Sequence, residues 1–379
     1  MKISESRSQP GLGEHVLIKG RSLLITLYVT SIGRHAGKDV IAVGLMDRAR
    51  RDGLKVAYFK PMGHSPVKLE NDIVDQGAWN ICQLFELEDP VEQICPVVVT
   101  QDMIMENYKG KVEGLQKKVL LAFENVSKQK DLVVVGCDDN FSEGSAFDLS
   151  GLRLMGLLNA NALFVEKYEC SFCVDFLLEL KNVVGRPMMG VVFNKVEAVH
   201  VEEIKEYVSP FLRQQEIEVF GSIPNDPLLD SIEVRELADR LGADVICGRD
   251  NLDALVETFL VGGMQVDKFI GHLLERTAVG VIVGGDRSDI QLAAIQNRVR
   301  CLILSGDLYP NETIVARAEV KGVPILVARD DTYKVAKQVE GAVGGLGLPK
   351  RDKIDRAIKL IDQGFDFEKL YKRLDLMPL

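Results

Sequence analysis

The sequence predicts an α/β protein with a mostly parallel sheet covered by helices on both faces, followed by a second, smaller α/β block. Short, β-branched apolar runs alternate with segments of helical period through most of the 379 residues. The connections between these segments are short, as in strand–helix–strand units. The rhythm breaks in a charged stretch at residues 242–253 and then resumes. We therefore expect two globular parts in one chain.

Composition narrows the class of protein further. An apolar content of 46% is enough for each part to bury a core of its own. The net charge of −10 argues against a general nucleic-acid binder, which needs a basic face. The seven cysteines are scattered, no apolar run reaches membrane-spanning length, and the first residues carry no targeting signal. We expect a cytoplasmic protein that binds neither nucleic acid nor a membrane.

Residues 23–45 have the pattern of a phosphate site. An apolar strand runs into a glycine-bearing loop at residues 30–39, and the loop opens an apolar helix. Such a loop directs backbone N–H groups and the positive end of a helix at an anion, and a lysine adds a full charge. We expect it to bind the phosphates of ATP or a related nucleotide. The candidate residues are Ser31, Gly33, Arg34, His35, Ala36, Gly37, Lys38 and Asp39.

The loop departs from the usual P-loop spacing at two positions. That spacing requires glycine where Ile32 stands and Ser or Thr where Asp39 stands. Gly33 replaces the first glycine if the loop is wound differently by one residue. Asp39 offers a carboxylate where a magnesium-binding hydroxyl is expected, so it either repels the phosphates or itself holds Mg²⁺. An ordinary glycine-containing turn between a strand and a helix is the alternative interpretation.

A lysine follows the next predicted strand. The spacing predicts a helix over residues 40–51 and a strand over residues 55–59, after which Lys60 precedes a proline. Because ligands of open α/β sheets bind at the carboxyl ends of the strands, Lys60 is a candidate nucleotide ligand. A surface lysine before a proline turn is the simpler reading.

Two further carboxylates are candidate Mg²⁺ ligands beside Asp39. Asp75 falls in the first turn of a helix predicted over residues 71–87, and Asp138 follows a strand predicted over residues 132–135. Hard cations prefer carboxylate oxygens. The helix dipole and ordinary turn chemistry explain the two acids equally well.

The strand and helix alternation then continues. Helices are expected over residues 106–130, 173–180 and 202–212, and strands over residues 162–165, 189–193 and 219–223. Asn194 and Lys195 follow the second of these strands and are further candidate nucleotide ligands. Cys170 and Cys173 have the spacing of half a metal site, but no second pair completes it, so we interpret them as structural.

The second block repeats polar groups at the ends of its strands. Strands are predicted at residues 281–283, 301–304 and 324–327, with a helix over residues 290–295 capped by Asp286 and Asp289. Parallel strands place their ends at one edge, so we expect an effector or subunit-contact site there. Its candidate residues are Gly285, Asp286, Arg287, Ser288, Asp289, Ser305, Gly306, Asp331 and Thr332. Residues 352–376 are expected to form a helical packing or dimerisation arm.

The order and spacing of several motifs resemble the amino-terminal region of long phosphotransacetylases. Residues 22–247 resemble their dethiobiotin synthetase-like domain, a P-loop NTPase-like fold related to cobyrinic acid a,c-diamide synthase, and residues 250–345 resemble their DRTGG domain. The motifs lie at residues 30–39, 60–61, 192–195, 223–226, 261–264, 285–289 and 331–332. This division gives a flexible leader (1–20), a P-loop domain (21–248), a DRTGG domain (249–347) and a helical arm (348–379).

The chain departs from the family pattern at several positions that bear on function. Active relatives carry Ser or Thr where this chain has Asp39, and a second acid where it has Gly77. They carry Glu-Gly where it has Gly136 and Cys137. The acetyl-transferring domain of the long phosphotransacetylases does not follow here. The implied protein is a nucleotide-binding regulator that is weakly catalytic or non-catalytic, with no residue assigned to catalysis and with Asn194 beside the base. It would form a homodimer and meet a protein partner in acetyl-phosphate or CoA metabolism. The alternatives are an ATP-dependent ligase of the dethiobiotin or cobyrinate type and a scaffold with a decayed nucleotide site.

Overall fold

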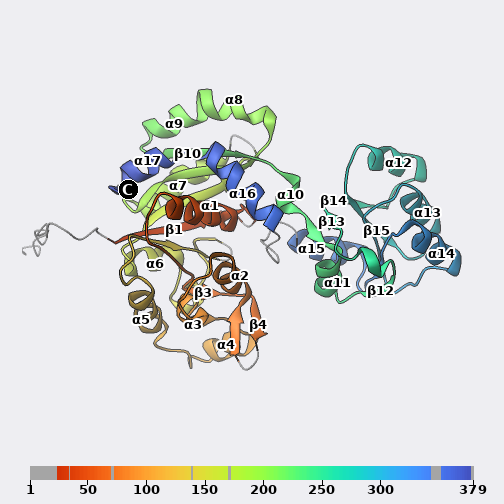
Figure 1. Cartoon of the computed structure of the whole chain (residues 1–379), viewed down its shortest axis with the longest axis horizontal. Helices are drawn as coiled ribbons and strands as arrows, with labels where there is room; N and C mark the ends of the chain where they lie inside the picture. The colour runs from red at the N-terminus through yellow and green to blue at the C-terminus, as the bar shows by residue number, and fades with distance from the viewer. Residues whose placement is uncertain are drawn as a thin grey trace, which may run out of the picture.

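The computed structural model of this chain describes residues 24–33, 35–69, 72–137, 140–169, 172–342 and 351–376. The chain forms a larger and a smaller lobe (Figure 1). Both contain a sheet with helices on its faces, which confirms the predicted α/β class. The expected leader, residues 1–20, lies outside the described residues. No helix in the described part of the chain combines the length and the apolar character needed to cross a membrane.

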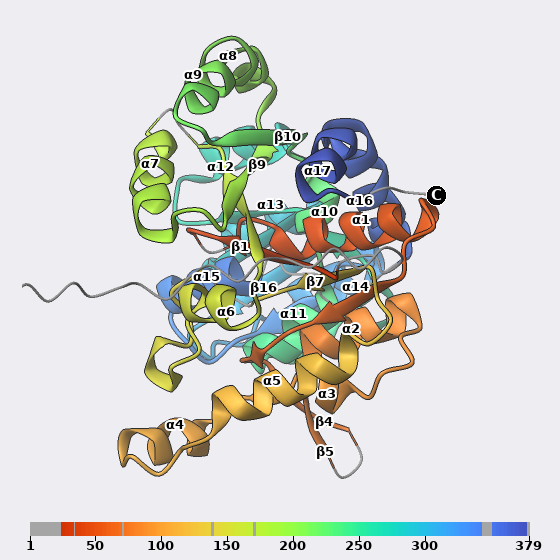
Figure 2. The ribbon, with the colours of Figure 1, turned by 90° about the vertical axis from the view of Figure 1, so that its left-hand side faces the viewer.

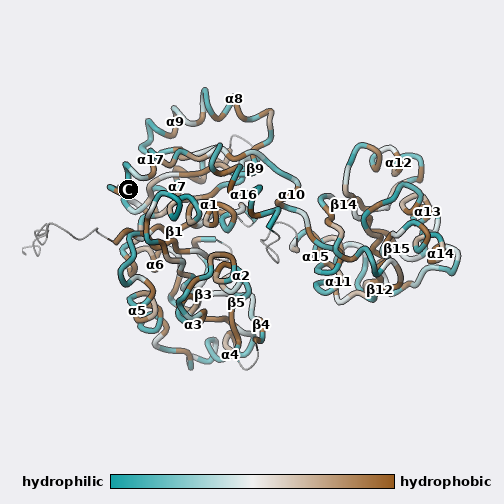
Figure 3. The backbone as a smooth tube through the Cα atoms, viewed as in Figure 1, coloured by the Kyte–Doolittle hydropathy of each residue, from teal (hydrophilic) through white to brown (hydrophobic). Residues whose placement is uncertain are grey.

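The larger lobe is built on a six-stranded sheet in the order β10-β9-β8-β1-β7-β2. Every strand pair in it is parallel. The strands are β1 (Ile25–Ser31), β2 (Val56–Phe59), β7 (Leu132–Val135), β8 (Asn161–Lys167), β9 (Met188–Val196) and β10 (Glu218–Pro224). All residues of β2 and β7 are buried because helices cover both faces of the sheet. Figure 3 colours the backbone by hydropathy, and hydrophobic segments lie between the helices of this lobe near β1. The five strands predicted after residue 54 are confirmed.

Helices and two small ribbons complete this lobe. The helices are α1 (Lys38–Arg51), α2 (Gln76–Phe85), α3 (Val91–Ile94), α4 (Gln101–Tyr108), α5 (Leu115–Val126), α6 (Gly151–Leu157), α7 (Cys173–Val184), α8 (Val201–Glu203), α9 (Ser209–Gln214) and α10 (Pro227–Asp230). The ribbons pair β3 (Met62–Gly63) with β6 (Val97–Val98), and β4 (Pro66–Leu69) with β5 (Asp72–Asp75).

Two predicted helices were wrong in extent. The segment predicted as one helix over residues 71–87 begins with β5, which pairs with β4, and α2 starts only after it. The predicted helix over residues 106–130 is divided into α4 and α5. Gly110 (φ 68°) and Gly114 (φ 74°) adopt the left-handed conformation between them, which ends a right-handed helix.

The smaller lobe contains a five-stranded sheet in the order β12-β17-β16-β15-β14. Its strands are β12 (Asp244–Cys247), β14 (Thr258–Val261), β15 (Val279–Gly284), β16 (Cys301–Ser305) and β17 (Ile325–Val327), and only β12 is antiparallel to its neighbour. A ribbon of β11 (Ile232–Glu233) and β13 (Leu255–Val256) and helices α11 (Val234–Leu241), α12 (Val266–Leu274), α13 (Ser288–Gln296), α14 (Glu312–Lys321) and α15 (Thr332–Ala342) complete it. This sheet therefore includes residues before the boundary expected at 248.

The last two helices return to the larger lobe. α16 (Arg351–Gly364) and α17 (Phe367–Leu374) lie beside α1 in both ribbon views (Figures 1 and 2). Gly44 of α1 makes room for this contact, because a Cβ there would lie 2.3 Å from Ile361 Cδ1. The buried apolar side chains of α16 and α17 belong to the same core as the first sheet. The expected arm is thus part of the larger lobe's own packing.

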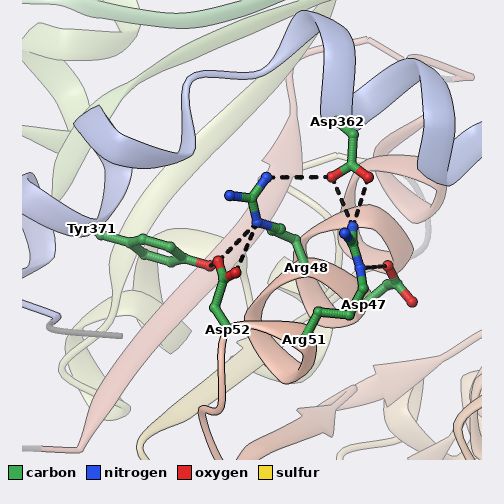
Figure 4. A network of polar contacts seen from close by, with 6 residues as sticks. All are labelled: Asp47, Arg48, Arg51, Asp52, Asp362 and Tyr371. Atoms are coloured by element: carbon green, nitrogen blue, oxygen red, sulfur yellow. Dashed lines mark hydrogen bonds and ion pairs between the residues drawn. The ribbon is translucent and has the colours of Figure 1, made fainter. Parts of the chain in front are cut away.

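Polar contacts reinforce this junction (Figure 4). Arg51 donates two hydrogen bonds to Asp362 of α16, at 2.8 and 2.7 Å. Tyr371 of α17 donates to Asp52, just after α1, at 2.9 Å, and Arg48 donates to the same carboxylate. The C-terminal helices are therefore fixed to the helix that follows the candidate phosphate loop.

Candidate functional site

The C-terminal end of the loop after β1 has two features that are typical of phosphate-binding loops. Gly37 adopts a left-handed conformation (φ 82°), and a Cβ on it would lie 2.2 Å from Asn194 Nδ2. Glycine is therefore required there by both conformation and space. Lys38 opens α1 directly after it and is 6% exposed. The loop thus joins a helix N-terminus to a buried lysine, the two groups that bind phosphate in such loops.

The N-terminal half of the loop differs from what its spacing suggested. Gly33 is exposed, and nothing lies within 4 Å of where its Cβ would be. Among the described residues of this half, His35 adopts a left-handed conformation (φ 56°), and Ser31 Oγ donates to the Gly33 carbonyl at 2.7 Å. Gly33 therefore meets no conformational or steric requirement for glycine. Arg34 lies outside the described residues.

The end of β9 braces the loop. The buried side chain of Asn194 donates from Nδ2 to the carbonyl of Ala36 at 2.8 Å. Lys195 adopts a left-handed conformation (φ 54°), and its Nζ lies 2.8 Å from Asp230 Oδ1. The structure brings both predicted residues to the loop, but the Asn194 amide holds the loop backbone. That Asn194 also reads a base stays a prediction.

The structure places Asp75, a candidate magnesium ligand, in a buried ion pair with Lys60. Its Oδ1 accepts from Lys60 Nζ at 2.7 Å and from the backbone N–H of Ala78 at 2.9 Å, and its Oδ2 accepts from the N–H of Ser65. The two side chains form a buried ion pair, 4% exposed for Lys60 and 0% for Asp75. Asp75 therefore caps α2 and pairs with the Lys60 ammonium. That it also holds Mg²⁺ stays a prediction.

The structure explains the missing acid after β7. A Cβ at Gly136 would lie 2.3 Å from the hydroxyl of Tyr58, so a glutamate does not fit there. Burial raises the pKa of the Cys137 thiol to about 11, although the nearby Lys38 ammonium opposes the rise. Cys137 is therefore a neutral thiol, and its Sγ lies 3.4 Å from Thr30 Oγ1 at the end of β1. Asp138 lies outside the described residues.

The remaining candidate metal ligand is Asp39. It is half-buried in the first turn of α1. Within the described ranges, no group of three or more His, Cys, Asp or Glu side chains is arranged to hold a metal ion.

Sequence reasoning missed Glu166, which lies near the end of β8. One carboxylate oxygen, Oε2, is buried and accepts no hydrogen bond within the described part of the chain. Burial raises the pKa of Glu166 to about 7, against a hydrogen bond from the backbone of Ile32 that lowers it. The sequence could have revealed Glu166 as an acid near the carboxyl end of a predicted parallel strand, the place where open α/β sheets bind ligands.

We expect Glu166→Gln to change the pH dependence of stability. The pKa of the folded state, about 7, lies above the ordinary value of 4.5, so the folded protein keeps a proton that the unfolded chain loses. Wild-type stability should therefore fall as the pH rises from about 5 to 7. The free energy of unfolding of the variant, relative to that of wild type, should therefore rise by on the order of 2 kcal/mol from pH 5 to pH 8. Urea unfolding at both pH values measures this gain.

The matched control is Glu179→Gln, because Glu179 is an exposed acid of α7 that is not among the groups shifting the pKa of Glu166. This control should keep the pH slope of wild type. Identical slopes for wild type and Glu166→Gln would contradict the raised pKa.

In the smaller lobe, the polar ends of β15, β16 and β17 meet at one edge. Ser305 Oγ lies 2.6 Å from Thr332 Oγ1, and the backbone N–H of Gly285 donates to the Ser305 carbonyl at 3.3 Å. Gly306 (φ 85°) is left-handed, and its N–H donates to the Asp330 carbonyl. The predicted strand-end residues are thus brought together.

Within this edge, the predicted helix cap was wrong. α13 begins at Ser288 with Arg287 in the cap position and no side-chain cap, so Asp286 does not cap it. Arg287 instead donates to both oxygens of Asp289, at 3.0 Å each, and to the carbonyl of Met264 at 3.0 Å. The Arg287 guanidinium lowers the pKa of Asp289. Arg287 therefore ties the segment before α12 to the start of α13.

Two further groups order the same edge. The fully buried Gln291 donates from Nε2 to the carbonyls of Gly284 and Gly285, at 3.2 and 3.0 Å, which the sequence did not reveal. Asp331 accepts from the backbone N–H of Lys334 at 3.0 Å in the first turn of α15. Side chains and backbone thus hold the strand ends in place.

Comparison with known proteins divides the chain between residues 233 and 236, directly after β11. Residues 25–233 match the AAA domain family, and residues 236–342 match the DRTGG domain. Similar curated proteins include the phosphate acetyltransferases of Synechocystis sp., 24% identical over 367 residues, and of Nitratidesulfovibrio vulgaris, 24% identical over 370 residues. These matches cover 92% of this chain but 52% and 51% of the relatives, so the chain spans about half the length of the curated relatives it matches.

Similar solved structures include three proteins. The septum site-determining protein MinD with Mg-ADP from Pyrococcus horikoshii is 14% identical, over 55% of this chain and 84% of that chain, with a TM-score of 0.34. Cobyrinic acid a,c-diamide synthase from Mycobacterium smegmatis is 14% identical, over 54% and 87%, with a TM-score of 0.33. The CBS and DRTGG domains of the Clostridium perfringens pyrophosphatase, complexed with the activator diadenosine tetraphosphate, are 15% identical, over 45% and 69%, with a TM-score of 0.26.

Proposed function

This chain belongs to the AAA domain family and continues into a DRTGG domain, and from that premise we propose that it is a nucleotide-binding regulatory protein. The P-loop lobe binds ATP or a related nucleotide, and the DRTGG lobe receives or transmits the signal. The observation that carries this proposal is the left-handed Gly37 followed by the buried Lys38 at the start of α1.

The surroundings of the loop favour binding over turnover. Asp39 stands in the first turn of α1 where a hydroxyl ordinarily serves Mg²⁺, so the cation of a Mg-nucleotide would meet this carboxylate. Lys60 is paired with Asp75 and so is poorly placed to position a second substrate for phosphoryl transfer. We infer that hydrolysis is slow and that the regulatory role depends on whether the nucleotide is bound.

The family relationship suggests where such a regulator acts. Phosphate acetyltransferases match this chain over about half of their length, which supports a cytoplasmic role beside a protein partner in acetyl-phosphate or CoA metabolism. The ordered strand-end edge around Ser305 and Thr332 is the proposed effector or subunit-contact site. A homodimer joined near this edge would let two chains share the signal.

Calorimetry with Mg-ATP tests the proposal. We expect one site per chain, and at a hundred times its Kd the nucleotide should add about 2.7 kcal/mol to stability. Phosphate release should stay far below an ordinary turnover of about ten per second. Rapid release with a candidate carboxylate would favour the ligase alternative, and no binding would favour the scaffold. Sedimentation across a concentration series checks the homodimer.

A further inference from the structure

A short connector, residues 225–231, leads from the larger to the smaller lobe and contains α10. It begins on the segment that braces the phosphate loop. The backbone N–H of Asn225 donates to the Val196 carbonyl at 2.9 Å, and its side chain donates to Glu197 at 2.7 Å. Ser231 ends the connector, and β11 of the smaller lobe follows directly. Any movement of the smaller lobe therefore acts on this connector.

A single lysine joins the connector to the loop. The Cε atom of Lys195 lies 3.7 Å from where a Cβ of Gly37 would be, so its side chain passes over the loop glycine. Its Nζ ends 2.8 Å from Asp230, the last residue of α10. The two side chains are 15% and 25% exposed, so water screens the pair only in part. Lys195 is thus within reach of both an acid of the connector and a phosphate in the loop.

α16 holds the other side of the connector. Arg356 donates to Asp226 at 2.6 Å, and the buried Lys353 donates to the carbonyl of Ser231. α16 also packs on α1, the helix that Lys38 opens, where Ile361 meets Gly44. The connector is therefore fixed between the end of β9, which contacts the phosphate loop, and α16, which packs on the helix that follows the loop.

We propose that this connector is a nucleotide-responsive switch whose moving part is Lys195. The proposal rests on the proposed nucleotide binding at the loop. When phosphates occupy the loop, the Lys195 ammonium leaves Asp230 for them, because several phosphate oxygens offer a stronger charge-assisted contact than one carboxylate. Asp230 then loses its partner, and α10, a single turn, loosens between the lobes. By linkage, a signal in the DRTGG lobe that displaces Asp230 strengthens nucleotide binding by the same factor.

The test is a double-mutant cycle with two measurements. Asp230→Asn, Lys195→Gln and the double variant are titrated with Mg-ATP, and hydrogen exchange of residues 225–235 is followed with and without the nucleotide. We expect Asp230→Asn to bind about three to ten times more tightly. Its connector should exchange quickly already without nucleotide and respond no further. In the Lys195→Gln background, Asp230→Asn should leave the affinity unchanged, because the competing cation is gone.

Asp148→Asn is the matched control, since Asp148 forms an exposed ion pair with Arg153 in the larger lobe, outside the segment followed by hydrogen exchange. It should behave as wild type in both measurements. Wild-type affinity in Asp230→Asn, or an equal gain with and without Lys195, would overturn the switch while leaving nucleotide binding intact. Absence of Mg-ATP binding in every protein, wild type included, would overturn the proposed function and the switch with it.

Discussion

Replacing Lys60 with methionine is expected to lower the free energy of unfolding of the larger lobe by about 3–5 kcal/mol. The variant leaves the carboxylate of Asp75, which is 0% exposed, without its cation in a site closed to water. The two backbone N–H groups that donate to Asp75 remain, but they carry no full charge to offset the buried anion. Urea unfolding at pH 7, followed by the fluorescence of Trp79, measures the loss.

Two comparisons separate the buried charge from other effects. Lys109→Met makes the same substitution in an exposed ion pair with Glu106 and should cost less than about 1 kcal/mol. The double variant Lys60→Met and Asp75→Asn removes both charges, keeps a cap for α2 and should recover most of the lost stability. A loss in Lys60→Met as small as in Lys109→Met would show that the pair is not buried as described.

Lys38→Ala is expected to weaken the binding of Mg-ATP at least about tenfold. The lysine is 6% exposed at the start of α1, so its contact with a phosphate is little screened by water. Calorimetry compares the variant with Lys55→Ala. This control removes an exposed lysine just before β2, at the amino-terminal ends of the strands, whereas the loop lies at their carboxyl ends. Equal affinity in Lys38→Ala and wild type would remove the loop from the nucleotide site.

The sequence predicted the sheet better than it predicted the site. Apolar, β-branched runs such as Leu132–Val135 have few alternatives to a buried parallel strand, so their positions could be predicted from local pattern alone. The pairing of Lys60 with Asp75 joins residues fifteen positions apart through the β4–β5 hairpin, which no local period reveals. The left-handed turn at His35 was equally hidden, because most such turns carry glycine and this one does not.

The same limit applies to the last residues of the chain. The helical period of residues 352–376 was read correctly, but a period does not say which surface the apolar face covers. That answer lies in Gly44, whose missing side chain admits Ile361, and a glycine within a helix is ordinarily read only as a weak helix former.

The return of α16 to α1 has a consequence for synthesis on the ribosome. α1 emerges long before α16, because the contact from Arg51 to Asp362 spans 311 positions of sequence. The smaller lobe is continuous from β11 to α15 and has every strand of its sheet available well before α16 has been made. The larger lobe therefore begins to be synthesised first but receives its last helices after the smaller lobe has been made. The apolar face of α1 that α16 covers stays exposed until then. Nascent chains stopped after residue 342 should accordingly be bound by chaperones that recognise exposed apolar helices, and chains extended past residue 376 should be released.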